Sequence, residues 1–347
     1  MSIVPKRILI IKLRAIGDVV LATPVIENLK QHFPEAHLTF LTEEASAEVV
    51  RWNPFLDELI VLPLKSWKQL GFTKSWRMQI KFYLNLRRKR FDLVIDLFGN
   101  PRSALLTWLT GASERIGYDF RGRHYAYNRV ISTRNKSIRH EVLFHLDSLS
   151  ALDVPAQVRN PLVVVPKMAM IRAVRWLTDK NMVNRKIIGL NPGGGWDIKR
   201  WPPDKFGRLA DLLINHFDVE ILILWGPGEE QLVEEVVNSM KHSPQVLPQT
   251  TLLELAGYLQ CCHLLISNDS GPMHIAAALD VTTIGIFGPT DPEGQGPWGN
   301  KHIVVQQDKV DCLGCNRTDC LIGNICLTTL EPEDVLAKID ASLPSKT

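Results

Sequence analysis

A turn suited to binding phosphate is the clearest chemical feature of the chain. The apolar run Leu264–Ile266 predicts a buried strand, and the turn Asp269-Ser270-Gly271 follows it. Pro272 predicts the start of a helix, because proline is favoured at the first helical position and small polar residues are favoured just before it. The free N–H groups and the dipole at a helix N-terminus bind anions. We therefore predict that this turn binds an anionic ligand.

A glycine-rich loop with two cations lies about 70 residues earlier. Gly193–Gly195 follow an apolar run and allow the backbone to approach a ligand closely, and Lys199 and Arg200 come a few residues later. The loop lacks the Gly-Lys-Ser/Thr order of a Walker A loop. Cations beside flexible glycines suit a diphosphate leaving group. The alternative is an exposed loop with incidental basic residues.

A candidate general base follows the first apolar run of the chain. The segment Ile16-Gly17-Asp18-Val19-Val20 contains a single glycine, so it is not the Gly-x-Gly-x-x-Gly fingerprint of dinucleotide-binding proteins. As an isolated carboxylate at the mouth of a sheet, Asp18 can accept a proton from a hydroxyl group. From spacing alone, a role as a helix N-cap is the competing interpretation.

Two further side chains are candidates for ligand contact. Glu230 lies just past the apolar run Val219–Trp225, where a carboxylate commonly binds ribose hydroxyls, although it also favours the first turn of a helix. His274 falls about one turn into the helix that begins near Pro272, so it faces the predicted ligand or is a packed histidine of the core.

The elements that position these residues occur in two similar series. Short apolar runs alternate with helix-length segments, a rhythm typical of parallel sheets covered by helices. The runs are Ile8–Ile11, Leu38–Leu41, Leu93–Leu97, Ile187–Leu190, Val219–Leu224, Leu264–Ile266 and Thr283–Phe287. We predict an α/β protein with two doubly wound domains and a ligand cleft between them. Ligands bind at the carboxyl ends of such strands, so the polar residues that follow each run are the candidates for contact with a ligand.

Domain boundaries follow from where this rhythm breaks. Prolines 155, 161 and 166 interrupt it, and a new series begins at Lys186. We predict an N-terminal domain over residues 1–165, a linker over 166–185, a C-terminal domain over 186–330 and a final helical segment over 331–347. At 347 residues, two domains are expected on length alone.

Composition indicates a water-soluble protein that works inside the cell. Hydrophobic residues make up 45% and charged residues 22% of the chain, as in ordinary globular proteins. No run of about 18 apolar residues predicts a membrane-spanning helix, and the first thirteen residues are too charged and too short for a signal peptide. We therefore expect a cytoplasmic location.

One segment concentrates positive charge despite a net charge of only +3. Residues 59–91 contain nine Lys or Arg, no Asp or Glu, and six aromatic residues. Basic residues mixed with aromatics suit an anionic membrane surface or an anionic ligand, and a solvated helix face is the alternative. No nucleic-acid-binding motif accompanies the segment, so we expect no nucleic-acid partner.

The six cysteines include a cluster near the C-terminus. Cys312, Cys315, Cys320 and Cys326 open with a Cys-x2-Cys pair, which occurs in zinc sites, but the later spacings fit no zinc module. A structural metal, a disulfide and unliganded thiols all remain open, and a reducing cytoplasm favours thiols. Cys261 and Cys262 lead into an apolar strand and are expected in the core.

Taken together, these segments resemble glycosyltransferase family 9, the bacterial ADP-heptose:lipopolysaccharide heptosyltransferases. The resemblance covers essentially the whole chain, and the sequence motifs are more similar to those of the heptosyltransferase II type than to those of type I. The matching stretches are residues 16–20 with Thr23-Pro24, Lys199-Arg200-Trp201-Pro202, and Asn268-Asp269-Ser270-Gly271-Pro272-Met273-His274.

The resemblance implies a GT-B fold, with two Rossmann-like domains, the N-terminal one binding the acceptor and the C-terminal one the nucleotide sugar. It implies an inverting transfer without a metal and without a cofactor. Asp18 matches the proposed base, Lys199 the phosphate contact and Glu230 the ribose contact, while Asp269, Ser270, Gly271 and His274 match the donor-binding turn. Arg200 is expected to assist Lys199, and the last helix is expected to pack across the domains.

The resemblance also implies the partners. These are a nucleotide sugar, expected to be ADP-heptose, and an anionic glycan acceptor with a lipid anchor. We expect the protein to be a monomer that contacts the surface of the inner membrane. Three alternatives stay open: a family member with another nucleotide sugar, a non-catalytic binding protein, and a nicotinamide enzyme. The missing glycine fingerprint disfavours the last of these.

Overall fold

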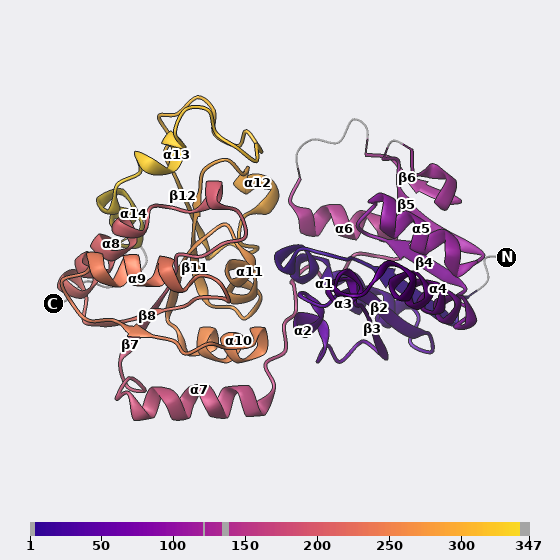
Figure 1. The fold of residues 1–347 in the computed structure, drawn as a ribbon, viewed down its shortest axis with the longest axis horizontal. Helices are drawn as coiled ribbons and strands as arrows, with labels where there is room; N and C mark the ends of the chain where they lie inside the picture. The colour runs from indigo at the N-terminus through magenta and orange to yellow at the C-terminus, as the bar shows by residue number, and fades with distance from the viewer. Residues whose placement is uncertain (1–3, 121, 134–138, 341–347) are drawn as a thin grey trace. The chain divides into compact units, whose positions relative to one another are not determined.

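The chain forms two compact units. The computed structural model describes residues 4–120, 122–133 and 139–340, and the units are Met1–Val164 and Val165–Thr347 (Figure 1). In the described residues each unit contains one six-stranded parallel sheet with helices packed against it. The predicted α/β class with two doubly wound domains is confirmed. All seven apolar runs predicted as strands form strands, and two of them extend one residue past the strand end, at Leu97 and Leu224.

The first unit has the strand order β3-β2-β1-β4-β5-β6. Its strands are β1 (Arg7–Ile11), β2 (His37–Glu43), β3 (Glu58–Leu62), β4 (Leu93–Asp96), β5 (Glu114–Tyr118) and β6 (Arg129–Ile131). Its helices are α1 (Ile16–His32), α2 (Ala47–Val50), α3 (Leu64–Gln69), α4 (Phe72–Arg88), α5 (Pro101–Thr110), η1 (His124–Ala126) and α6 (Glu141–Ser150). The chain order reverses between β1 and β4, and ligands of such sheets bind at the carboxyl ends of the strands at this point.

The second unit repeats this order as β12-β11-β10-β7-β8-β9. Its strands are β7 (Lys186–Asn191), β8 (Val219–Ile223), β9 (Gln245–Val246), β10 (Leu264–Asn268), β11 (Thr282–Phe287) and β12 (Ile303–Gln306). Its helices are α7 (Lys167–Asp179), η2 (Asp197–Lys199), α8 (Pro203–His216), α9 (Glu230–Ser239), α10 (Leu252–Cys261), α11 (Gly271–Ala278), α12 (Pro292–Gln295), α13 (Ile325–Thr328) and α14 (Pro332–Asp340). The reversal here lies between β7 and β10.

The segment predicted as a linker differs in the structure. Most of residues 166–185 form α7, which packs against α10 inside the second unit, with Trp176 edge-on to Tyr258 at 5.6 Å. The boundary between the units falls between Val164 and Val165, one residue before the predicted end of the N-terminal domain. The helix forms because Ala169, Ala173 and Leu177 repeat every four residues and bury one face.

The last described helix also belongs to the second unit. α14 packs against α8, and its Val335 and Ile339 are fully buried in the core of that unit. The residues after 340, which the prediction included in the same segment, lie outside the described residues.

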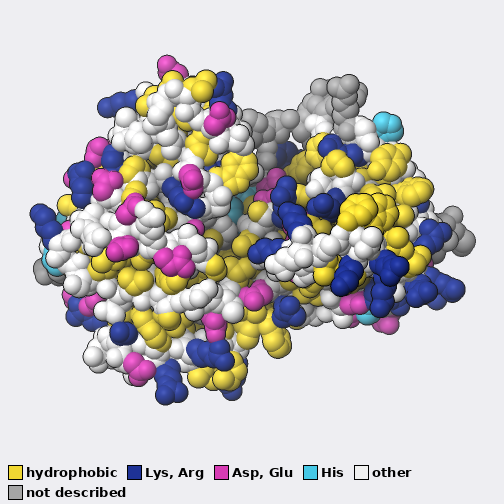
Figure 2. All heavy atoms as spheres, viewed as in Figure 1, with side chains coloured by type: hydrophobic (Ala, Val, Ile, Leu, Met, Phe, Trp, Pro, Cys, Tyr) yellow, Lys and Arg dark blue, Asp and Glu magenta, His cyan; other side chains and the backbone are white. Residues whose placement is uncertain are grey.

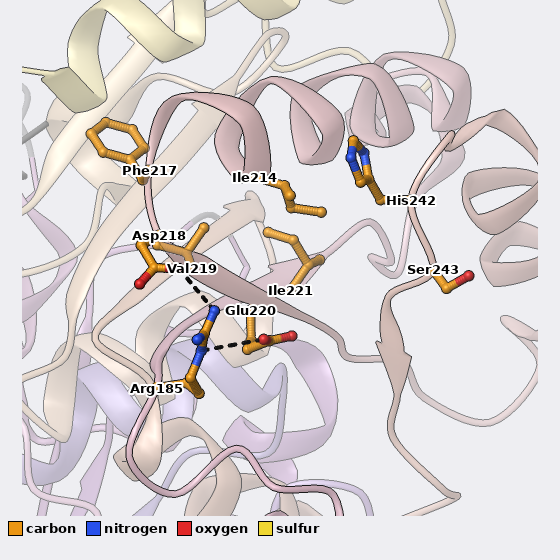
Figure 3. Close-up of a pocket in the computed structure, with 9 residues that line it drawn as sticks. All are labelled: Arg185, Ile214, Phe217, Asp218, Val219, Glu220, Ile221, His242 and Ser243. Carbon is orange, nitrogen blue, oxygen red and sulfur yellow. Dashed lines mark hydrogen bonds and ion pairs between the residues drawn. The ribbon is translucent and has the colours of Figure 1, made fainter. Parts of the chain in front are cut away.

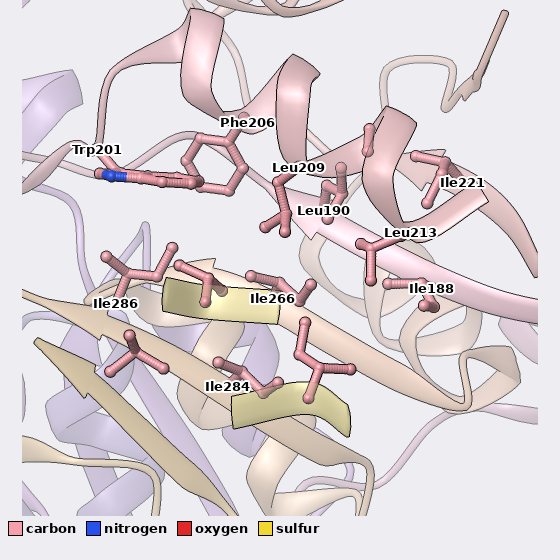
Figure 4. Packing of buried hydrophobic residues seen from close by; sticks show 14 of the residues in the cluster. Ile188, Leu190, Trp201, Phe206, Leu209, Leu213, Ile221, Ile266, Ile284 and Ile286 are labelled. Atoms are coloured by element: carbon pink, nitrogen blue, oxygen red, sulfur yellow. The ribbon is translucent and has the colours of Figure 1, made fainter. Parts of the chain in front are cut away.

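The core of the second unit is built around a buried tryptophan. Trp201 packs edge-on against Phe206 of α8 at 5.0 Å, above the isoleucines and leucines of β7, β10 and β11 (Figure 4). Its indole N–H donates to the carbonyl of Leu330 at 3.0 Å, and its backbone N–H donates to Asn268 Oδ1 at 3.0 Å. Trp201 therefore joins α8, the C-terminal segment and the end of β10.

Replacing Trp201 by alanine is expected to lower the free energy of unfolding of the second unit by about 3 to 5 kcal/mol. The change leaves a cavity and removes one of the two groups that donate to the Leu330 carbonyl, the other being Lys205 Nζ. Urea denaturation followed by circular dichroism measures the effect. Trp196→Ala is the matched control, because that indole is half exposed on the preceding loop; an equal loss in both variants would contradict the role of Trp201.

Candidate functional site

The two loops predicted to bind the donor meet at the carboxyl edge of the second sheet. β7 and β10 are neighbours, and they end at Asn191 and Asn268. The Asn268 amide donates to the carbonyl of Pro192 at 2.7 Å, and the Asn191 amide donates to Ser270 Oγ at 2.9 Å. The glycine-rich loop and the predicted anion-binding turn are thus tied together at the point where the strand order reverses.

Lys199 and Asp269 form the central ion pair of this edge. Lys199 Nζ lies 2.6 Å from Asp269 Oδ2, and the Asp269 side chain is buried. The ammonium group also lies 5.7 Å from the centre of the Trp196 ring. A carboxylate and an aromatic face hold the cation in place, so its charge is pre-positioned for an anionic ligand.

A helix N-terminus lies beside this pair, where the sequence predicted the start of a helix. α11 begins at Gly271, and the side chain of Ser270 at its N-cap makes no capping hydrogen bond. The Ser270 hydroxyl instead accepts from Asn191, which leaves the positive end of the helix to other partners. His274 is buried in the first turn of the same helix. The roles of these residues stay predictions.

Arg200 makes contacts within the glycine-rich loop. Its guanidinium group donates to the carbonyl of Gly194 through Nε at 2.9 Å and through Nη2 at 2.6 Å, and it pairs with Asp197 at 2.8 Å. These contacts hold the backbone around Lys199 in one conformation. A direct contact between Arg200 and phosphate stays a prediction.

Glu229 contacts the glycine-rich loop, whereas its neighbour Glu230, the residue predicted to bind ribose, does not. Glu230 is exposed on the first turn of α9, whereas Glu229 accepts from the N–H of Gly194 at 2.9 Å and from the N–H of Gly226 at 2.8 Å. A Cβ atom at Gly193 would collide with the Glu229 carboxylate, so a larger residue there would displace this side chain. Consecutive glutamates after a strand gave no signal to choose between them.

We expect Glu229→Ala to weaken ADP binding by about tenfold or more, because hydrogen bonds to a charged group contribute about 1.5 to 3 kcal/mol and two loops lose theirs. Glu230→Ala is the matched control and is expected to change the affinity less than twofold. Isothermal titration calorimetry with ADP measures both. The opposite order would support Glu230, the residue predicted from the sequence, as the ribose contact.

Asp18 lies near the start of α1, next to a buried lysine. Its Oδ2 accepts from the backbone N–H of Ala15 at 3.3 Å and lies 3.5 Å from Lys12 Nζ. The N-cap residue is Ala15 rather than Asp18, so the carboxylate reaches back to the cap from the first turn. Asp18 is one-third exposed, which leaves it accessible to a hydroxyl group.

Sequence reasoning missed three side chains that form a chain of contacts starting at this carboxylate. Lys12 Nζ also lies 3.3 Å from Glu141 Oε1 at the start of α6, and His145 Nε2 lies 3.3 Å from the same oxygen. Burial raises the pKa of Glu141, and burial together with Lys12 holds the pKa of the His145 imidazole well below its usual range. A lysine directly after the buried run Ile8–Ile11 was the signal available in the sequence.

Asp96, a carboxylate at the end of β4 in the first sheet, has a structural role. It ends β4 beside β1, is fully buried, and accepts from the Tyr127 hydroxyl at 2.7 Å and the N–H groups of Phe98 and Gly99 at 3.0 Å. Burial raises its pKa. Asp18 is therefore the better candidate for accepting a proton from a substrate.

The cysteine cluster borders the Lys199 loop. Cys312, Cys315, Cys320 and Cys326 carry free thiols and line a cavity of about 250 Å³ together with Ile198. The Asn324 amide donates to the Ile198 carbonyl at 3.0 Å, which anchors this segment to the loop. Within the described residues no group of three or more His, Cys, Asp or Glu is arranged to hold a metal ion.

A second cavity lies at the opposite end of the sheet strands. It measures about 260 Å³ and surrounds the start of β8 (Figure 3). Arg185 pairs there with Asp218 at 2.8 Å and with Glu220 at 3.4 Å, so its cation is neutralised by the lining. Ligands of doubly wound sheets bind at the carboxyl ends, so we do not assign this cavity to the site.

Two doubly wound units, one of which has a lysine close to a helix N-terminus at the point where the strand order reverses, define a two-domain α/β protein. The chain belongs to glycosyltransferase family 9 (heptosyltransferase), because the model of that family matches residues 79–326. The protein is therefore a glycosyltransferase. Nothing in the described part of the chain forms a helix long and apolar enough to cross a membrane.

Similar proteins extend over nearly the full length. The chain is 28% identical to lipopolysaccharide heptosyltransferase 3 of Escherichia coli, covering 95% of this chain and 97% of that protein. A glycosyl transferase family 9 structure from Veillonella parvula has a TM-score of 0.83 at 26% identity, with 97% and 96% of the chains covered. E. coli ADP-heptose lps heptosyltransferase II shares the fold, with a TM-score of 0.76 at 21% identity and coverages of 96% and 98%.

Proposed function

We propose that the protein transfers heptose from ADP-heptose to the inner core of lipopolysaccharide, with inversion at the anomeric carbon and without a metal ion. Its relatives support the substrates, since they include a lipopolysaccharide heptosyltransferase 3 and an ADP-heptose lps heptosyltransferase II. The observation that carries the proposal is the Lys199–Asp269 pair, held at 2.6 Å at the reversal point of the second sheet.

The second unit binds the donor in this proposal. Lys199 contacts the diphosphate, and the N-terminus of α11 at Gly271 contacts it from the backbone. Arg200 keeps the loop in place through the Gly194 carbonyl. Glu229 is positioned through Gly194 and Gly226 to bind the ribose hydroxyls.

Asp18 is the general base of the reaction. It takes the proton of an acceptor hydroxyl while that oxygen attacks the anomeric carbon from the face opposite the leaving group. The bond between the sugar and the diphosphate breaks, and ADP leaves with the electron pair. One displacement of this kind inverts the configuration.

The charge that develops on ADP is met by protein groups. Lys199 and the dipole of α11 supply positive charge at fixed positions, which is the role a divalent cation has in other transferases. Full activity in excess EDTA is the expected result, and activity restored only by added Mg²⁺ or Mn²⁺ would contradict it.

The acceptor is an anionic glycan with a lipid anchor. A monomer in the cytoplasm that contacts the inner membrane peripherally fits such an acceptor. The basic segment 59–91 supports this part of the proposal.

Thermal stabilisation by ADP, UDP, GDP and NAD tests the donor. We expect ADP to raise the melting temperature most, and transfer from ADP-heptose to a heptose-deficient core acceptor to follow. Stabilisation mainly by UDP would point to another nucleotide sugar, and stabilisation by NAD alone would contradict a transferase site.

A further inference from the structure

Helix α4 combines an apolar face with a row of cations on the surface of the first unit. One face of the helix packs against the rest of the unit, because Leu86 is buried and Phe82 packs edge-on against the buried Trp67 at 5.5 Å. The opposite face is open to solvent. The helix is therefore a fixed part of the fold that presents one long side outward.

The outward side carries large apolar residues. Trp76, Ile80 and Leu84 are 55%, 45% and 50% exposed, and Phe72 at the start of the helix is 79% exposed. Residues four apart on a helix are rotated by only about 40°, so Trp76, Ile80 and Leu84 form one stripe, which we call the α4 stripe. Exposed apolar residues in a contiguous row mark interaction surfaces.

A row of cations runs beside the α4 stripe. Arg77, Lys81 and Arg88, which are spaced by four and seven residues, lie on the neighbouring side of the helix, and we call them the cationic row. The segment 59–91 contains no acidic residue, so nothing along the helix compensates their charge. Figure 2 shows hydrophobic and basic side chains gathered next to one another on the unit that contains α4 and α5.

We propose that α4 lies in the surface of an anionic lipid bilayer, with the α4 stripe among the acyl chains and the cationic row at the headgroups. Amphipathic helices with Trp or Leu on one face and Lys or Arg beside it bind membranes in this way. A protein partner for the same face would have to match both rows, whereas an anionic bilayer supplies both chemistries along its whole surface. The inference deepens the proposed function and rests on it for its purpose, which is to bring the enzyme to a lipid-anchored acceptor.

Vesicle co-sedimentation of the full chain tests this surface. Vesicles of phosphatidylethanolamine mixed with the anionic lipid phosphatidylglycerol are compared with pure phosphatidylcholine vesicles at low and high salt. We expect binding to the anionic vesicles that weakens as salt screens the charges. Equal binding to phosphatidylcholine, or no binding to either, would overturn the proposal.

Two variants separate the rows. Trp76→Ser is expected to weaken binding about tenfold, because a buried aromatic side chain is lost from the apolar phase. Its control is Trp52→Ser, which removes an indole that is 54% exposed outside α4. Arg77→Gln with Lys81→Gln is expected to weaken binding to anionic vesicles about 20-fold or more, since each cation near the surface contributes about 1 kcal/mol. The control, Arg175→Gln with Lys186→Gln, changes the net charge equally in the second unit.

A second copy of the chain is the competing occupant. Light scattering without lipid is expected to give the same mass for the parent and Trp76→Ser. A dimer that Trp76→Ser dissociates would overturn the membrane assignment. Transfer to a delipidated, soluble core acceptor separates this inference from the proposed function: the α4 variants are expected to keep that activity. If the parent lacks transfer but binds anionic vesicles, the proposed function fails while the membrane surface stands.

Discussion

Asp18→Asn is expected to lower the rate of sugar transfer by about 10² to 10⁴, the usual contribution of a general base. Asparagine has nearly the same shape and still accepts a hydrogen bond from the N–H of Ala15, so the start of α1 is kept. What the amide cannot do is take a proton from the acceptor. The variant therefore separates the two interpretations of this residue, a base and a helix cap.

Single-turnover transfer from ADP-heptose measures the rate, and calorimetry with ADP measures donor affinity, which is expected to stay unchanged. The melting temperature serves as the control for folding. Retained turnover in Asp18→Asn would leave the carboxylate a structural group. The neighbouring Lys12→Met tests positioning: it removes the cation 3.5 Å from Asp18, and we expect it to lower kcat more than it changes KM for the donor.

Lys199→Ala is expected to weaken ADP binding by about 10- to 100-fold, because it removes a charge-assisted contact to the diphosphate. We expect kcat/KM for ADP-heptose to fall further, by about 10² to 10³, since the cation counts most when the leaving group carries its full charge. Loss of the lysine also leaves the buried Asp269 without its partner, which adds repulsion toward the phosphates.

Calorimetry and steady-state kinetics measure these two effects. Lys186→Ala is a matched control, because Lys186 is exposed at the start of β7, at the opposite end of the strand. Asp269→Asn separates the two causes, since it removes the repulsive carboxylate and keeps Lys199. An unchanged affinity for ADP in Lys199→Ala would remove the lysine from the site.

The fold was predictable because parallel strands buried on both faces appear as short apolar runs. Ile8–Ile11 and Ile187–Leu190 open the two series, and each becomes the first strand of a sheet with the same order. The position of α7 was not predictable in the same way. Three prolines suggested a linker, whereas the packing of Ala173 and Leu177 against α10 depends on a helix far along the chain.

The loops of the candidate site could be predicted from the sequence, whereas the contacts between individual residues mostly could not. Lys199 and Asp269 were both predicted as donor contacts, but their ion pair joins residues 70 positions apart and needs the neighbouring strands β7 and β10 to form. The choice between Glu229 and Glu230 depends on how one turn enters α9, which periodicity does not resolve. The contact of Glu141 with Lys12 spans 129 positions and left no local signal.

The contact between Trp201 and Leu330 has a consequence for synthesis of the chain. The two residues are 129 positions apart, and Lys205 likewise donates to the Leu330 carbonyl and to Glu331. At ordinary translation rates, roughly 6 to 26 s separate their emergence, while the first unit is already complete. During that interval α8 has no C-terminal segment to cover it, and its large apolar side chains stay open to chaperones. The nascent second unit therefore closes its core only after the segment from Leu327 to Ile339 has left the ribosome.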